Sequence, residues 1–176
     1  MMQAQMYASA AHAAIGQKRK YSGEPYINHP GRVVGILRAC QYFDINMLSA
    51  AWMHDVVEDT NVTLDDIRLF FNDEITNLVS ELTNTSKLSE GNRAKRKEMD
   101  KQRISSCSYI AKTIKLADIY DNCRSFINDS IIYPEAKDFG KIWVKEKIDL
   151  MTVLTDSDEK LYNETMRLLT NNGTFF

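Results

Sequence analysis

The sequence predicts an all-α protein, and three observations carry that prediction. Apolar residues recur at spacings of three and four along most of the chain, as they do on one face of a helix. The 176 residues include only three prolines and seven glycines, so few positions interrupt a helix. Runs that alternate between apolar and polar residues, as strands do, are nearly absent. We therefore expect a single domain over residues 1–176, a helical bundle of about eight to ten helices.

Helix-capping residues set the expected elements in the first part of the chain. A first helix is expected over about Gln3–Ile15, followed by a basic turn at Lys18–Pro25. A second helix is expected over Pro30–Ala39, because proline is favoured in a first helical turn. Asp44 is a good N-cap for a third helix over Ile45–Val57.

The rest of the chain continues the helical pattern. Thr63, with Asp66 three residues later, resembles a capping box for a helix over Leu64–Phe71. Ser86–Asn92 is expected to be a loop, and Asn171–Gly173 to end the last helix. The other expected helices are Ile75–Leu82, Asn92–Ser105 (strongly charged, or only partly ordered), Ser108–Ser125, Pro134–Leu154 and Asp158–Thr170.

Composition excludes several classes of protein. The net charge of −2 gives no electrostatic reason to expect nucleic-acid binding. No apolar run approaches the roughly 18 residues of a membrane span, and the N-terminus lacks the basic start of a signal peptide. Cys40, Cys107 and Cys123 form no C-x-x-C, which argues against a structural zinc site or a disulfide framework. A cytoplasmic protein is expected.

The segment AAWMHDVVEDT, residues 50–60, carries the most chemical information. On a continuous helix, His54 lies beside Glu58 and Asp55 beside Asp59. Burying such groups in an apolar stretch costs on the order of several kcal/mol unless they are paired or bind a metal. The pattern therefore favours a divalent metal with a carboxylate base beside it.

Two further residues complete a set of metal donors. His29 lies upstream and Asp118 downstream, so that with His54 and Asp55 the chain offers two imidazoles and two carboxylates. Mixed nitrogen and oxygen donors suit Mn²⁺ or Fe²⁺ and are compatible with Zn²⁺. Any one of these residues alone is explained as an ordinary core histidine or a helix cap. The chain has only three histidines, however, and two fall in this pattern; His12 is not assigned to the metal.

The order His…His-Asp…Asp resembles the signature of the HD-domain metal-dependent phosphohydrolases. The segments GQKRKYSGEPYINHPGRVVGIL, AAWMHDVVEDTNVTLDDI and IKLADIYDN are similar to the hydrolase domain of RelA/SpoT proteins. The resemblance is greatest to the stand-alone small alarmone hydrolases of the metazoan SpoT homologue type, and it covers essentially the whole chain. It implies Mn²⁺-dependent hydrolysis of the 3′-pyrophosphate of (p)ppGpp to GDP or GTP and pyrophosphate, which lowers the stringent-response signal.

The resemblance also implies roles for individual residues. The metal ligands would be His29, His54, Asp55 and Asp118. Glu58 and Asp59 would position and activate the attacking water, although a charged pair at a helix end also explains them. Substrate contacts would come from Arg19, Lys20, Lys97 and Asn122; solvated surface positions are the alternative reading of these four.

The chain departs from the family pattern in its late helix. Trp143 and Lys147 stand where the family carries an Arg and a Tyr that help to bind the nucleotide. The Arg is absent, and Lys145 or Lys147 could substitute for part of its charge. Lysine does not replace arginine at planar contacts, so the preferred alarmone, whether ppGpp, pppGpp or ppApp, stays open.

Other functions are compatible with the same metal-binding and nucleotide-binding residues. The same chemistry on another nucleotide, such as NADPH or a deoxynucleotide, is one alternative, and a non-catalytic alarmone-binding module is another. Hydrolases of this type also occur as antitoxins, so an alarmone-synthetase toxin is a partner that the resemblance allows. The pattern says nothing of the oligomeric state.

Overall fold

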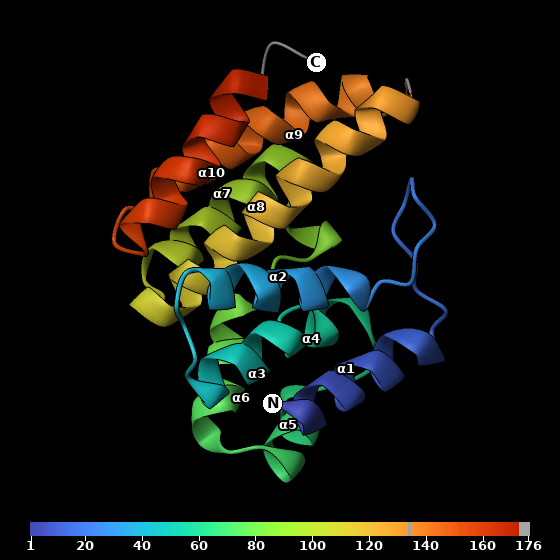
Figure 1. Ribbon diagram of the computed structural model, residues 1–176, viewed down its shortest axis with the longest axis vertical. Helices are drawn as coiled ribbons and strands as arrows, with labels where there is room; N and C mark the ends of the chain where they lie inside the picture. Colours follow the sequence, from blue (N-terminus) through green and yellow to red (C-terminus); the bar gives the residue numbers. More distant parts are fainter. Residues whose placement is uncertain (134, 173–176) are drawn as a thin grey trace.

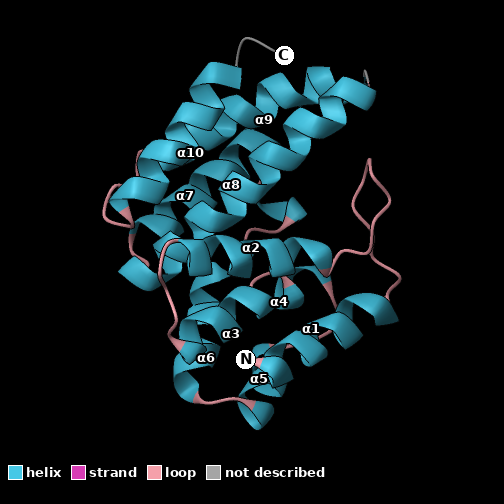
Figure 2. Cartoon of the chain, in the orientation of Figure 1, coloured by secondary structure: helices cyan, strands magenta, loops and turns pink. Residues whose placement is uncertain are grey.

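The computed structural model describes residues 1–133 and 135–172 of the chain. These residues form ten α-helices and one short 3-10 helix, with no strand among them, so the all-α prediction is confirmed (Figure 2). The helices are α1 (Met2–Ala14), α2 (Asn28–Ala39), α3 (Ile45–Met53), α4 (Val56–Asp59), α5 (Leu64–Phe70), α6 (Asp73–Leu82), η1 (Leu88–Glu90), α7 (Arg93–Ser105), α8 (Tyr109–Ile132), α9 (Glu135–Met151) and α10 (Glu159–Asn172).

The longest helix, α8, organises the bundle. It packs against α2, α3, α6, α9 and α10. Figure 1 shows α1, α3, α5 and α6 on one side of the molecule and α8, α9 and α10 on the other, with α2 crossing between the two groups. None of the described helices is long and apolar enough to cross a membrane. Whether residues 1–176 act as a single domain stays a prediction.

The buried part of α8 is unusual in its polarity. Ser108 caps the helix by accepting a hydrogen bond from the backbone N–H of Ala111. The following turns bury apolar side chains such as Ile114 and Ile119, but they also bury Lys115 and Asp118. Buried polar groups need partners, and α8 finds them in the elements that pack around it.

The prediction of one continuous helix over Ile45–Val57 was wrong. Asp44 does cap α3, since its Oδ1 accepts from the Met47 N–H at 2.8 Å, but α3 ends at Met53 and α4 begins at Val56. The reason is a competing hydrogen bond, in which His54 Nδ1 donates to the carbonyl of Ala51 at 2.9 Å. This carbonyl would otherwise accept from the backbone four residues later, so the helix breaks at His54 and Asp55.

Most of the remaining helix boundaries lie within a few residues of the prediction, with α8 as the main exception. The capping box is present, with Thr63 and Asp66 exchanging side-chain and backbone hydrogen bonds. The charged segment forms the helix α7, which begins after its N-cap residue Asn92. The expected loop contains η1, and α8 extends seven residues beyond the expected Ser125 to Ile132. Helix α10 continues through Asn172, while Gly173 and Pro134 lie outside the described residues.

The basic turn forms a hairpin-like loop before α2. The backbone N–H of Arg19 donates to the carbonyl of Glu24 at 2.9 Å, and Lys18 and Pro25 form an isolated bridge. Gly23 adopts a φ of 69°, a left-handed conformation that glycine takes without strain. The loop thereby holds Arg19 close to the start of α2.

We expect Leu37→Ala to destabilise the protein by about 2–5 kcal/mol, because it leaves a cavity in the hydrophobic core beneath α2. Leu37 is 0% exposed, whereas Leu69 on α5 is 78% exposed and provides a matched control. Leu69→Ala should change the free energy of unfolding by less than about 0.5 kcal/mol. Denaturant unfolding of both variants measures the difference, and equal losses would contradict this description of the core.

Candidate metal centre and active site

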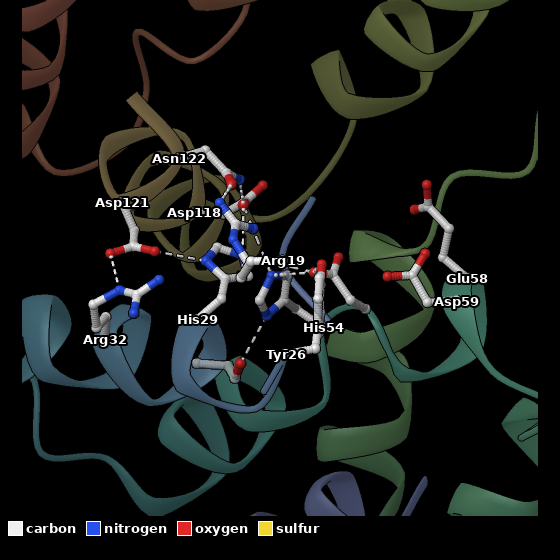
Figure 3. Close-up of polar contacts among 12 residues, drawn as sticks. Arg19, Tyr26, His29, Arg32, His54, Glu58, Asp59, Asp118, Asp121 and Asn122 are labelled. Atoms are coloured by element: carbon white, nitrogen blue, oxygen red, sulfur yellow. Dashed lines mark hydrogen bonds and ion pairs between the residues drawn. The ribbon is translucent and has the colours of Figure 1, made fainter. Parts of the chain in front are cut away.

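Four ionisable side chains converge where α2, α8 and the break between α3 and α4 meet (Figure 3). His29 lies in the first turn of α2, His54 and Asp55 form the break, and Asp118 lies in the buried part of α8. Single donor atoms of His29, His54 and Asp55 all lie within 4.8 Å of one another. Oδ1 of Asp118 is 3.2 Å from Nε2 of His29 and 3.8 Å from Nε2 of His54.

Both imidazoles present the same nitrogen to this cluster. Nδ1 of His54 donates to the Ala51 carbonyl, and Nδ1 of His29 lies 2.7 Å from the Asp121 carboxylate. The two Nε2 atoms are buried and have no hydrogen-bond partner within the part of the chain that the structure describes. They face the oxygens of Asp55 and Asp118, and lone pairs that face carboxylates repel unless positive charge lies between them. The donor set of two imidazoles and two carboxylates therefore fits a divalent cation.

The electrostatics of the cluster favour positive charge. Burial lowers the pKa of His54, but the carboxylates of Asp55 and Asp118 outweigh it and raise that pKa well above its usual value. Burial raises the pKa of Asp118, yet Lys115, whose Nζ is 2.8 Å away, and both imidazoles hold it well below its usual range. Without a cation, protons on the imidazoles supply the positive charge that the carboxylates require.

Neighbouring side chains hold the carboxylates in place. Tyr26 Oη donates to Asp55 Oδ2 at 2.6 Å, and burial, followed by the charge of Asp55, raises the pKa of Tyr26, so its phenol stays protonated. Asn122 donates to Asp118 through Nδ2 and accepts from Arg19 Nη2 at 2.9 Å.

The acidic pair of α4 lies to one side of the imidazoles (Figure 3). Asp59 accepts a hydrogen bond from Gln17 Nε2 at 2.8 Å, while Glu58 accepts from Asn84 Nδ2 at 3.0 Å. Burial and the charge of Asp55 raise the pKa of Asp59 above its usual value. Asp59 is therefore a stronger base than an ordinary aspartate.

The four residues predicted to contact substrate occupy different places. Arg19 and Asn122 lie at the cluster through their hydrogen bond to each other. Nζ of Lys97 lies 3.6 Å from Oδ2 of Asp100 on the same helix, α7. Lys97 also lines a cavity of about 410 Å³ between α7 and α9. Lys20 lies over aromatic rings instead, with its Nζ 5.4 Å from the centre of the Phe139 ring.

The cavity between α7 and α9 is rich in lysine. Lys115 and Lys147 line it together with Lys97, and Asn84, which holds Glu58, lies at its edge. Burial and the charge of Lys115 lower the pKa of Lys147 to about 8. Nζ of Lys147 lies 5.5 Å from the centre of the Trp143 ring. The lining also includes four carboxylates, those of Glu98, Asp100, Glu146 and Asp149, so basic side chains outnumber acidic ones only six to four. Among the basic side chains, Lys115 lies next to the metal cluster through its contact with Asp118.

Two residues at the centre were not singled out by the sequence analysis. Asp121 accepts from His29, and Arg32 donates to Asp121 through Nε at 2.8 Å. Asp121 belongs to the segment IKLADIYDN, and its position one turn after Asp118 was a signal that it shares the buried face of α8.

We expect Mn²⁺ to raise the melting temperature of metal-stripped protein more at about pH 8.5 than at about pH 6. The raised histidine pKa values mean that protons occupy Nε2 at the lower pH and must be displaced. The protonated imidazoles stabilise the metal-free protein fully below the unfolded pKa of roughly 6.5, and this stabilisation is lost as pH rises through their raised pKa values in the folded protein. Mn²⁺ therefore adds more to the free energy of unfolding at high pH.

Thermal unfolding with and without Mn²⁺ at both pH values measures this effect. His54→Gln should remove the stabilisation by Mn²⁺, whereas His12→Gln should keep it, because His12 is outside the group of donor atoms. Equal stabilisation at the two pH values, or stabilisation that survives in His54→Gln, would rule out proton displacement at this cluster.

Comparison with known proteins is consistent with this geometry. The HD domain family profile matches residues 4–127. The chain is 37% identical over 153 residues to the guanosine-3′,5′-bis(diphosphate) 3′-pyrophosphohydrolase MESH1 of Drosophila melanogaster, covering 84% of this chain and 82% of that protein. It is 38% identical over 126 residues to the human MESH1 protein, covering 70% of this chain and 68% of the other.

Similarity in three dimensions extends over nearly the full length. A solved structure described as a metazoan ortholog of SpoT that hydrolyzes ppGpp superposes with a TM-score of 0.82 at 29% sequence identity. The match covers 98% of this chain and 94% of that one. The chain therefore belongs to the HD domain family, together with the MESH1 proteins.

Proposed function

We propose that this protein hydrolyses the 3′-pyrophosphate of (p)ppGpp, releasing GDP or GTP and pyrophosphate. The observation that carries the proposal is the buried cluster, in which two Nε2 atoms without hydrogen-bond partners face the carboxylates of Asp55 and Asp118. The names of the Drosophila and human relatives, and the described activity of the similar solved structure, support this substrate.

The metal ligands in this proposal are His29, His54, Asp55 and Asp118. Their mixed nitrogen and oxygen donors favour Mn²⁺, and Fe²⁺ and Zn²⁺ accept the same set. When bound, such an ion polarises a phosphoryl oxygen and lowers the pKa of a bound water.

The protein's own side chains supply the remaining chemistry. Asp59, with its raised pKa, accepts the proton of the attacking water. Glu58, held by Asn84, orients the water from the same side. Tyr26 keeps one oxygen of Asp55 engaged by a hydrogen bond, so that this carboxylate does not turn away from the cluster.

Positive groups around the cluster account for recognition of a polyanionic nucleotide. Arg19 lies at the cluster, and Lys97 lines the adjoining cavity, so that both can meet phosphate oxygens. Lys20 would reach the substrate by leaving the rings beside it, and Asn122 would meet the ribose. Lys147 and Trp143 are the positions that would choose among ppGpp, pppGpp and ppApp. A cytoplasmic location and an alarmone-synthetase partner stay predictions.

We expect metal-stripped protein given ppGpp and Mn²⁺ to release GDP and pyrophosphate in equal amounts, because cleavage is at the 3′-pyrophosphate ester. Without metal, neither product should form. Anion-exchange chromatography of the reaction identifies the products. Release of inorganic phosphate instead of pyrophosphate, or no turnover of ppGpp, pppGpp or ppApp, would contradict the proposal, and NADPH in the same assay tests the alternative substrate.

We expect Asp59→Asn to lower kcat by about 10²–10⁴-fold, because an amide cannot accept the proton of the attacking water. Asp65→Asn is the matched control, since Asp65 is exposed on α5 and forms an ion pair with Arg68 on the surface. The control should keep the wild-type rate. Both variants should still bind Mn²⁺, which separates loss of the base from loss of the metal. A kcat of Asp59→Asn within about threefold of wild type would remove Asp59 from the mechanism.

A further inference from the structure

Asp121 is a buried carboxylate that is held on both of its oxygens. Oδ2 lies 2.7 Å from Nδ1 of His29, and Oδ1 accepts from Nε of Arg32 at 2.8 Å (Figure 3). The residue is only 4% exposed, although it lies three residues after Asp118 on α8. It faces the side of the His29 ring opposite to the cluster, so it is not one of the four donors themselves.

The contacts of Asp121 continue outward to the loop that carries Arg19. Nη1 of Arg32 donates to Glu24 Oε1 at 2.8 Å, and Glu24 Oε2 accepts from Asn28 at 3.1 Å. Arg32 thus fixes the plane of the Asp121 carboxylate and is itself fixed by Glu24. Hydrogen bonds from His29 and Arg32 outweigh the effect of burial and lower the pKa of Asp121, in keeping with its ion pair to the Arg32 guanidinium.

An imidazole can bind a cation through either ring nitrogen, and the partner of the other nitrogen decides which one is free. At His54 this partner is a neutral backbone carbonyl, that of Ala51. At His29 it is an ionised carboxylate, and hydrogen bonds to ionised acceptors are stronger than those to neutral ones. His29 is therefore the more firmly oriented and the more electron-rich of the two imidazoles.

We propose that Asp121 is a positioning residue, whose carboxylate holds the proton of His29 on Nδ1 and so presents the Nε2 lone pair to the cation. The inference rests on the metal site of the proposed function. Asp121 acts through His29 and touches neither the cation nor the substrate. Arg32 and Glu24 restrain Asp121 and tie its orientation to the loop before α2.

A purely structural role makes a different prediction. If Asp121 only tied α8 to α2 through Arg32, its loss would lower the melting temperature and leave the metal affinity of the folded protein unchanged. If it orients His29, the metal affinity falls even where the fold is intact. Affinity for the metal alone, measured separately from stability and from turnover, therefore distinguishes the two roles.

The test is the Mn²⁺ affinity of the metal-stripped full chain, followed by the electron paramagnetic resonance signal of free Mn²⁺. Asp121→Asn keeps the shape of the side chain and removes its charge, and should weaken Mn²⁺ binding by about 10–100-fold. Asp129→Asn is the matched control, because Asp129 lies on the same helix and is partly buried near Arg19 and Arg32. The control should bind Mn²⁺ as the wild type does.

The outcomes separate this inference from the proposed function. If the wild type binds Mn²⁺ and Asp121→Asn binds within about threefold of it, or if Asp129→Asn loses as much affinity, the role of Asp121 is overturned while the metal site stands. If the wild type does not bind Mn²⁺, the metal site falls and the inference falls with it.

A second measurement on the wild type covers the case in which Asp121→Asn does not fold. Long-range proton–nitrogen NMR spectra of the Zn²⁺-loaded protein report which ring nitrogen of His29 carries the proton. We expect the proton on Nδ1, protected from exchange by Asp121. A proton on Nε2 of His29 would overturn the inference, whatever the variant does.

Discussion

The burial of two imidazoles and two carboxylates at one point is the constraint on which the rest of the structure depends. Such groups are expensive to remove from water unless each finds a partner, and here each does. His54 takes the carbonyl of Ala51 and thereby ends α3. Asp55 accepts a hydrogen bond from the phenol of Tyr26. Asp118 forms an ion pair with Lys115 and accepts a hydrogen bond from Asn122. The break in the helix, the polar face of α8 and the position of Tyr26 are all consequences of that one requirement.

Two separate networks lead outward from the cluster to the same loop. One runs from Asp118 through Asn122 to Arg19, and the other runs from His29 through Asp121 and Arg32 to Glu24. Because Arg19 and Glu24 are joined by a backbone hydrogen bond, the loop is held at both ends. The elements that would recognise phosphates are thus set in place by the elements that would hold the metal.

The sequence predicted those features that depend on neighbours along the chain. The cap at Asp44 and the capping box at Thr63 and Asp66 need only residues three positions apart, so their spacing reveals them. The helix break at His54 was missed, because it depends on the burial of that side chain and not on local propensity. The contact of His29 with Asp121 joins residues 92 positions apart, and no local pattern encodes it. The four candidate ligands were found because two imidazoles and two carboxylates suit a divalent metal and because their order resembles a family motif, and their roles stay a prediction.

The position of the cluster between the two groups of helices has a mechanical consequence. His29 belongs to the helix that crosses between the groups, His54 and Asp55 to the group with α1 and α3, and Asp118 to the group with α9 and α10 (Figure 1). A cation held by all four would join both groups as a non-covalent cross-link. Sliding of one group against the other would then require ligand bonds to stretch. Chelation would remove that cross-link and leave the two groups joined by the packing of α8 against α2, α3 and α6.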